Sequence, residues 1–79
     1  MTKKEKEIMV NTYSETVEKM GFLGLFNAEY GDYKEEYEKE VIKEEVLCNI
    51  LTKMGIDTEH IFNNSMKTGG EKAKKLLTE

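Results

Sequence analysis

Two side chains in the sequence are of types that carry out nucleophilic chemistry, the single cysteine, Cys48, and the single histidine, His60. A neighbouring histidine can remove the thiol proton of a cysteine and so activate the sulfur for attack. Cys48, however, is spaced from Val41 and Leu51 like residues on one helix face, which predicts a small buried hydrophobic side chain. His60 falls near the start of a short predicted helix, where we expect it to be exposed. We therefore predict no catalytic residues and no enzymatic activity.

The sequence has few side chains suited to binding zinc, and it has no phosphate-binding loop motif. A zinc site requires several converging cysteine, histidine or carboxylate side chains, and the sequence offers one cysteine and one histidine. The glutamates alternate with lysines, as in Glu35–Lys39 and Glu40–Lys43, which is typical of ion pairs on a solvated helix face. The glycine pair at 69–70 lacks the spacing of a phosphate-binding loop. We predict neither a metal site nor a cofactor.

Residues 46–61 have the pattern of two helices joined by a tight turn. A glycine ends the first helix, hydrophobic residues flank the turn, and another hydrophobic residue anchors the second helix. The residues that match these places are Met54, Gly55, Ile56 and Ile61. The segment resembles the helix-turn-helix of bacterial and phage repressors. The resemblance implies a DNA-binding transcriptional regulator, with a groove-facing set formed by Thr58, Glu59, His60, Asn63 and Asn64.

The stretch from Glu29 to Glu45 is strongly acidic and carries three tyrosines, whose spacing of three and then four residues predicts one helix face. It holds eight acidic and three basic residues, so its net charge is −5. Tyrosine is enriched at protein interfaces because it joins a large apolar ring to a polar hydroxyl. Our leading hypothesis is a non-enzymatic protein that binds a basic partner surface; the alternative is that the tyrosines pack on the first helix and the carboxylates are merely solvated. The proposed contact residues are Tyr30, Tyr33, Tyr37, Glu36, Glu40 and Glu44.

Hydrophobic spacing predicts an all-α fold, a small bundle of three to four helices. The first helix is expected over about residues 2–20, with a capping box at Thr2 and Glu5 and a stop at Gly21. The apolar, glycine-punctuated segment that follows, 21–27, is expected to form a buried connector or a brief helical turn. Its four large side chains are expected in the core, and the alternative is an exposed docking patch: Phe22, Leu23, Leu25 and Phe26.

A long helix over about residues 32–54, capped by Asp32 and ended by Gly55, is expected to organise the bundle. Its second half, 41–54, is apolar nearly all round, which predicts a path through the core. Its first half, 32–40, is expected to project into solvent. A short helix from Asp57 or Thr58 to about 63–66, a flexible break at 67–70 and a last helix at 71–77 complete the prediction.

Length and charge limit the functions that the chain can have. Its 79 residues suit a single domain, 1–79, with a small core. All twelve basic residues are lysine and the net charge is −4, which disfavours nucleic-acid partners, because arginine and positive charge dominate phosphate recognition.

No apolar run is long enough to cross a membrane, and a lone cysteine suits a reducing cytoplasm. We expect a cytoplasmic regulatory or accessory factor, of the kind found in phages and mobile elements. Homodimerisation is a further hypothesis, because self-association adds burial to a small chain.

Overall fold

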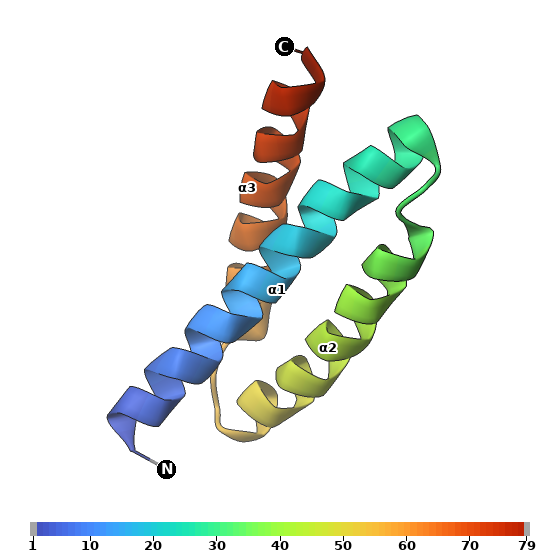
Figure 1. Cartoon of the computed structure of the whole chain (residues 1–79). Helices are drawn as coiled ribbons and strands as arrows, with labels where there is room; N and C mark the ends of the chain where they lie inside the picture. The colour runs from blue at the N-terminus through green and yellow to red at the C-terminus, as the bar shows by residue number, and fades with distance from the viewer. Residues whose placement is uncertain (1, 79) are drawn as a thin grey trace.

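The computed structural model describes residues 2–78 and consists of three α-helices joined by two short connections (Figure 1). The helices are α1, Lys3–Tyr30, α2, Lys34–Lys53, and α3, Thr58–Thr78. No strand occurs among residues 2–78, so the predicted all-α fold is confirmed. The molecule is elongated, with principal extents of 42 × 22 × 18 Å.

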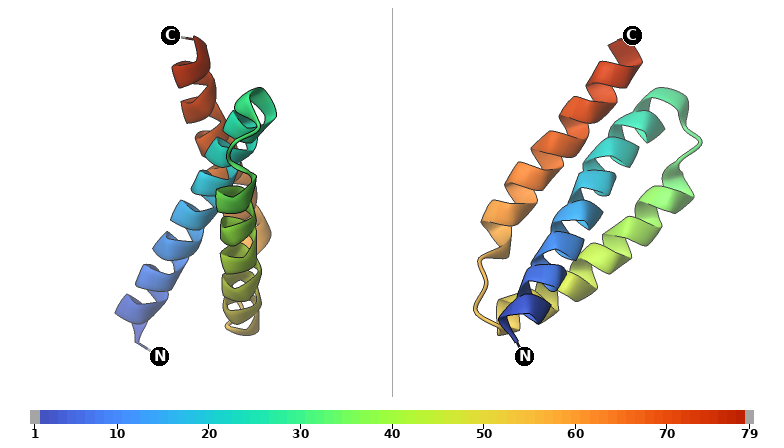
Figure 2. Two further views of the ribbon diagram at one scale, coloured as in Figure 1. Left: turned by 45° about the vertical axis from the view of Figure 1, so that its right-hand side comes forward. Right: turned by 60° about the vertical axis from the view of Figure 1, so that its left-hand side comes forward.

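The helix at the centre of the fold is α1. It packs against both other helices, whereas α2 and α3 make very few contacts with each other. Figure 2 shows α1 between its two neighbours, with α3 running in the same direction as α1 and α2 in the opposite direction. The prediction that the helix at about 32–54 organises the bundle is therefore wrong. α1 is the longer helix, with 28 residues against 20 in α2. It reaches this length because it continues through Gly21, where the sequence predicted its end.

Gly21 lies inside α1 at the point where α3 comes closest. A Cβ atom added to Gly21 would lie 2.5 Å from the carbonyl oxygen of Met66 and 3.2 Å from the amide nitrogen of Gly70, both in α3. Glycine is used where another backbone approaches this closely, so it marks a helix crossing and not the predicted helix end. The expected connector at 21–27 is accordingly α-helical.

Gly69 of α3 has the same role from the opposite side. A Cβ atom added to Gly69 would overlap the carbonyl oxygen of Glu18 in α1 and would lie 3.0 Å from the amide nitrogen of Phe22. The buried residues of α3 are all small and recur every four positions: Ser65, Gly69 and Ala73. Together they let α3 lie against α1, so the predicted flexible break at 67–70 is instead a packed stretch of one continuous helix.

The core is small and draws on all three helices. Its fully or nearly fully buried hydrophobic side chains are Tyr13, Val17 and Met20 from α1, Leu51 from α2, and Ala73 from α3. Partly buried side chains pack around this cluster: Met9, Val10, Leu47, Cys48, Met54, Ile56, Ile61, Phe62 and Met66. Three large hydrophobic side chains of α2 remain exposed outside this core, Ile42, Val46 and Ile50.

α2 is buried along one face only, which corrects both predictions made for its two halves. In the second half, Leu51 is fully buried, whereas Ile42 is 62% exposed and Val46 is 54% exposed. In the first half, Tyr37 is half-buried and Glu40 is buried, so this part does not project freely into solvent. The physical reason is that α2 lies at the edge of the fold and has α1 as its main neighbour.

Three of the predicted helix ends agree with the structure, at Thr2, Gly55 and Thr58. The Thr2 hydroxyl oxygen accepts a hydrogen bond from the amide of Glu5 at 3.1 Å, as the capping box predicts. Gly55 follows α2 in the left-handed conformation, with φ 80°, and α3 begins at Thr58. The predicted cap at Asp32 is wrong, because α2 begins at Lys34 and no side chain caps it.

Candidate functional site

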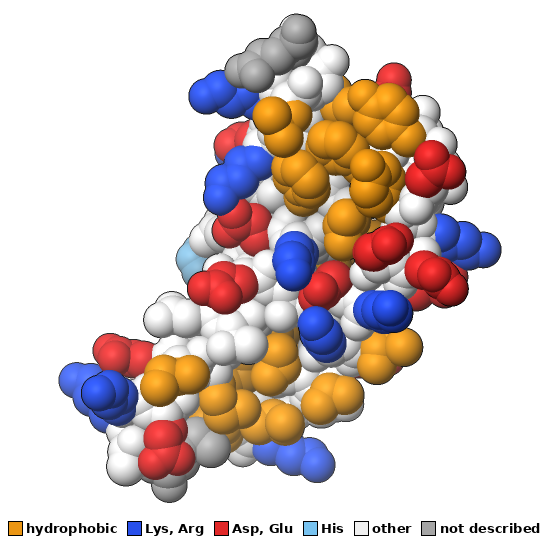
Figure 3. Space-filling model, in the orientation of Figure 1, with side chains coloured by type: hydrophobic (Ala, Val, Ile, Leu, Met, Phe, Trp, Pro, Cys, Tyr) orange, Lys and Arg blue, Asp and Glu red, His pale blue; other side chains and the backbone are white. Residues whose placement is uncertain are grey.

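Four aromatic rings gather where α1 ends and α2 begins, and we call them the aromatic cluster: Phe22, Phe26, Tyr30 and Tyr33. The rings of Phe22 and Phe26 stack with their centroids 4.6 Å apart. Phe26 also contacts Tyr30 and, edge to face, Tyr33, each with centroids 5.7 Å apart. Hydrophobic side chains form a continuous area over this end of α1 in Figure 3. Tyr30 is 58% exposed, so the cluster has one large ring facing solvent.

The loop between α1 and α2 is held in place by Asn27. Gly31 ends α1 in the left-handed conformation, with φ 77°, and its amide donates to the carbonyl oxygen of Asn27 at 2.7 Å. The amide of Tyr33 donates to the side-chain oxygen of Asn27 at 3.2 Å. These two bonds turn the chain back so that Tyr33 meets Phe26, which brings residues from two helices into one cluster.

The three tyrosines of the proposed contact set do not lie on one face of one helix. α1 ends at Tyr30, and Tyr33 precedes the first residue of α2, so the spacing that suggested a single face spans a loop. Tyr30 and Tyr33 still come together through Phe26. Tyr37 lies elsewhere, packed over Gly24, and it lines a groove between α2 and α3. Only two of the three tyrosines therefore belong to the aromatic cluster.

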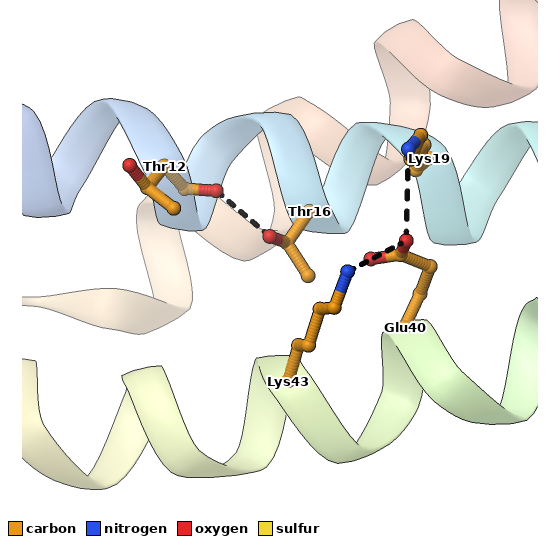
Figure 4. A network of polar contacts seen from close by, with 5 residues as sticks. All are labelled: Thr12, Thr16, Lys19, Glu40 and Lys43. Carbon is orange, nitrogen blue, oxygen red and sulfur yellow. Dashed lines mark hydrogen bonds and ion pairs between the residues drawn. The ribbon is translucent and has the colours of Figure 1, made fainter.

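The carboxylates of the acidic stretch separate into an exposed group and an inward-facing group. The exposed ones near the aromatic cluster are Glu29, Asp32, Glu35 and Glu36. Glu40, in contrast, is 7% exposed, and its Oε1 lies 3.7 Å from the ammonium of Lys19 and 3.5 Å from that of Lys43 (Figure 4). Figure 4 shows this carboxylate between α1 and α2, beside Thr16, whose hydroxyl donates to the backbone of Thr12. Glu40 thus joins the two helices.

Glu44 is also engaged within the fold. Its carboxylate accepts a hydrogen bond of 2.7 Å from the hydroxyl of Tyr13, a fully buried residue of α1. Burial raises the pKa of the Tyr13 hydroxyl well above its usual value, and the hydrogen bond and negative charge of Glu44 raise it further. Tyr13 therefore keeps its proton in the folded protein at pH values where an unfolded tyrosine ionises.

This arrangement predicts a loss of stability in alkali. Below about pH 10 tyrosine is protonated in both states and contributes no pH dependence. Above that value the unfolded chain releases the Tyr13 proton and the folded chain retains it, so stability falls by at most about 1.4 kcal/mol per pH unit. Tyr13→Phe is expected to reduce this fall, measured by urea unfolding between about pH 8 and about pH 11. The control is Tyr30→Phe, which removes an exposed hydroxyl and should unfold like the original chain across this range. An equal effect of both substitutions would contradict the assignment of the pH dependence to Tyr13.

The cysteine and the histidine have separate partners. The Cys48 sulfur lies 3.4 Å from the hydroxyl of Thr58 and 3.9 Å from that of Thr52. The His60 ring is exposed and is hydrogen-bonded to the side chain of Asn64 at 3.1 Å. Within residues 2–78 no hydrogen bond joins Cys48 to His60, so the geometry of a thiol and its base is not formed.

The residues that resemble a recognition helix occupy the first two turns of α3. Glu59, His60, Asn63 and Asn64 are exposed, and Thr58 is half-buried beside Cys48. The helix then continues to Thr78, and its small residues hold it along α1. α3 thus has α1, and not α2, as its principal packing partner.

The described part of the chain has neither a metal-binding group of side chains nor a membrane-spanning helix. Among residues 2–78 no group of three or more cysteine, histidine or acidic side chains is placed to hold a metal ion. No helix within the same range is both long and apolar enough to cross a membrane.

Two features of the surface differ from what the sequence suggested. Phe22 and Phe26, together with Leu23 and Leu25, are half-buried and not part of the core. An exposed hydrophobic stripe runs along α2 through Ile42, Val46 and Ile50. The four-residue spacing of these residues is a sequence signal for one helix face, but the segment is apolar on its other side as well, so its pattern alone does not separate the exposed face from the buried one.

Comparison with known proteins identified no relative of this chain. No protein-family model matches the sequence, and neither the curated proteins nor the solved structures include a significant match to the chain. The surface itself is therefore the basis for the functional proposal.

Proposed function

We propose that this protein is a non-enzymatic interaction protein that binds a basic protein surface through the aromatic cluster and the carboxylates around it. The proposal keeps the acidic, tyrosine-bearing segment of the leading hypothesis but changes its members. Glu40 and Glu44 already form contacts within the fold, an ion pair with Lys19 and a hydrogen bond with Tyr13. Phe22 and Phe26 replace them, because they support the exposed tyrosine.

The observation that carries the proposal is the exposed ring of Tyr30 held against Phe26. A tyrosine that already packs against another ring loses less side-chain freedom on binding, and such preorganised aromatic residues often dominate interface energies. The Asn27 bonds fix the loop on which the cluster depends. The cluster therefore offers a partner a rigid apolar surface with a polar hydroxyl at its edge.

The charges around the cluster favour a basic partner. Glu29, Asp32, Glu35 and Glu36 are exposed on the same stretch of chain, where Lys34 is the one basic residue between them. An acidic rim attracts positively charged surfaces and repels nucleic acid. Binding should accordingly weaken as the salt concentration rises.

Truncation of the exposed ring tests the proposal. Tyr30→Ala is expected to weaken binding of captured partner proteins by at least about tenfold, since tyrosine hot spots contribute ~2 kcal/mol or more. The measurement is affinity capture from the source cells with quantitative mass spectrometry, followed by calorimetry with the captured protein. A charge reversal, Glu29→Lys with Glu36→Lys, should weaken the same complex and remove most of its salt dependence.

Ile8→Ala is the matched control, because Ile8 is 57% exposed and lies near the start of α1, at the opposite end of that helix from Tyr30. It should bind the partner as the original chain does. Unchanged affinity of the Tyr30 and charge-reversal variants, with both still helical by circular dichroism, would refute the proposed surface.

DNA binding through Thr58 to Asn64 is the weaker proposal. The segment 58–66 contains no lysine and has Glu59 in its first turn. Affinity for DNA depends largely on cations that neutralise phosphates, and the nearest ones along α3 begin at Lys67.

A further inference from the structure

The ring of Tyr30 presents an electron-rich face to solvent at the end of α1. Its centroid lies 5.7 Å from that of Phe26, with the two ring planes at 42°. Phe26 therefore supports one side of the ring, while the Tyr30 side chain as a whole stays 58% exposed. The face of an aromatic ring carries partial negative charge and attracts a cation that comes within about 6 Å of the ring centroid. The exposed face thus favours a positively charged group over an aliphatic one.

Carboxylates near this ring outnumber the lysines on the same stretch of chain. The exposed charged residues from 29 to 39 are five acidic and two basic, a net charge of −3: Glu29, Asp32, Lys34, Glu35, Glu36, Glu38 and Lys39. The total stays negative when Lys74 and Lys75, near the end of α3, are included. Figure 3 shows acidic side chains beside the hydrophobic area over this end of α1. The ring face and the surrounding charges therefore attract the same kind of group.

The lysines at the other end of the aromatic cluster leave this balance unchanged. Phe22 borders a groove that is lined by three lysines and three glutamates: Lys19, Lys43, Lys72, Glu15, Glu18 and Glu40. Each of these lysines has an acidic partner, since Lys19 and Lys43 contact Glu40 and Lys72 contacts Glu18. The Phe22 end of the cluster is accordingly neutral, and the acidic end is the one that holds the exposed ring.

The combination of a ring face and neighbouring carboxylates distinguishes between the two common cations of proteins. The guanidinium group of arginine is flat and weakly hydrated, so it can lie on a ring while its N–H groups donate to carboxylates. The ammonium group of lysine is compact and strongly hydrated, and it stacks less well. Glu29 directly precedes Tyr30, and Asp32 directly precedes Tyr33, so carboxylates are available at both tyrosines of the cluster. These features favour arginine.

We propose that the residue by which the partner anchors itself is an arginine, whose guanidinium group lies on the exposed face of Tyr30 and pairs with the carboxylates beside it. This inference rests on the proposed protein-binding function and names the chemical group that the aromatic cluster recognises. It makes a lysine in place of that arginine a poor substitute, although the charge is the same.

A short peptide of alternating arginine and glycine tests the recognised group. Titrated into the isotopically labelled chain, it should shift the amide signals of residues 30–33, and the ring of Tyr30 should move the peptide δ-methylene protons upfield. The same peptide with lysine should bind at least about threefold more weakly, and one with uncharged citrulline at least about tenfold more weakly. Equal affinity of the arginine and lysine peptides would overturn the proposal, as would no shift at millimolar peptide.

Two substitutions of Tyr30 separate the ring face from simple hydrophobic contact. Tyr30→Phe keeps an aromatic face and should bind the arginine peptide within about twofold of the original chain. Tyr30→Leu keeps a large apolar side chain without such a face and should bind about three- to thirtyfold more weakly, the range of cation–π contacts. Circular dichroism checks that both variants stay helical. Binding by Tyr30→Leu that equals binding by Tyr30→Phe would refute the stacked arginine.

The failure of this inference differs from the failure of the proposed function. If Tyr30→Ala weakens binding of the captured partner but the peptides show no preference for arginine, the surface stands and the recognised group is wrong. If Tyr30→Ala leaves partner binding unchanged, the surface itself is wrong, and the arginine assignment is overturned with it.

Discussion

Replacing Gly69 with alanine is expected to lower the free energy of unfolding by about 3 kcal/mol, a large part of the ~4–12 kcal/mol typical of a chain this size. The added Cβ atom would overlap the carbonyl oxygen of Glu18 and lie 2.8 Å from its carbonyl carbon. These are backbone atoms of α1 and cannot rotate away as a side chain would. α1 and α3 must separate to admit the methyl group, which loses packing along the interface. Chemical unfolding by urea, followed by circular dichroism, measures the change.

The neighbouring glycine provides the control. A Cβ atom added to Gly70 would have its nearest neighbour, the Leu25 side chain, at 3.7 Å, an ordinary contact. Alanine also favours helix over glycine by up to about 1 kcal/mol, so Gly70→Ala is expected to be neutral or stabilising. Equal effects at the two adjacent positions would show that helix propensity, and not the close approach of α1, governs this segment.

Leu51→Ala is expected to destabilise the fold by about 2–5 kcal/mol, the range for fully buried leucines. Leu51 is the residue of α2 that reaches the core, where it clusters with Tyr13 and Val17. Its removal leaves a cavity that the short connections at either end of α2 do not readily close. The same urea titration measures the loss.

The control for this substitution is an exposed aliphatic residue. Ile8 in α1 is 57% exposed, and Ile8→Ala should change the free energy of unfolding by less than about 0.5 kcal/mol. A small effect of Leu51→Ala, comparable to that of Ile8→Ala, would contradict the assignment of the core to this face of α2.

Helix content and several helix ends follow directly from local sequence. Thr2 and Glu5 form a capping contact, and Gly55 is in a left-handed conformation after α2. Such signals depend on atoms within a few residues, so the sequence alone reveals them. The all-α class follows for the same reason, since each helix carries its own hydrophobic periodicity.

The glycines mark the limit of that approach. Gly21 and Gly31 are both residues of the type that commonly ends a helix, yet the first lies inside α1 and the second ends it. The difference is set by Met66 and Gly70, more than forty residues away in the sequence, whose backbone atoms occupy the space beside Gly21. A tertiary contact of this kind overrides helix propensity and has no local signature.

The candidate site was predictable only in part, because it also depends on tertiary contacts. The acidic, tyrosine-rich stretch was identified by composition, and Tyr30 and Tyr33 do belong to one cluster. Which carboxylates face inward depends on the positions of Lys19 and Tyr13 on α1. The sequence of the stretch itself carries no information on those positions.

The scarcity of contacts between α2 and α3 determines how the molecule opens. α1 takes part in two largely separate packing interfaces, so α2 can detach while the glycine-lined pair of α1 and α3 stays together. Such partial opening requires less free energy than global unfolding. Amide protons of α2 can then exchange with solvent by a route closed to those of α1. We therefore expect amide exchange to be slowest in α1.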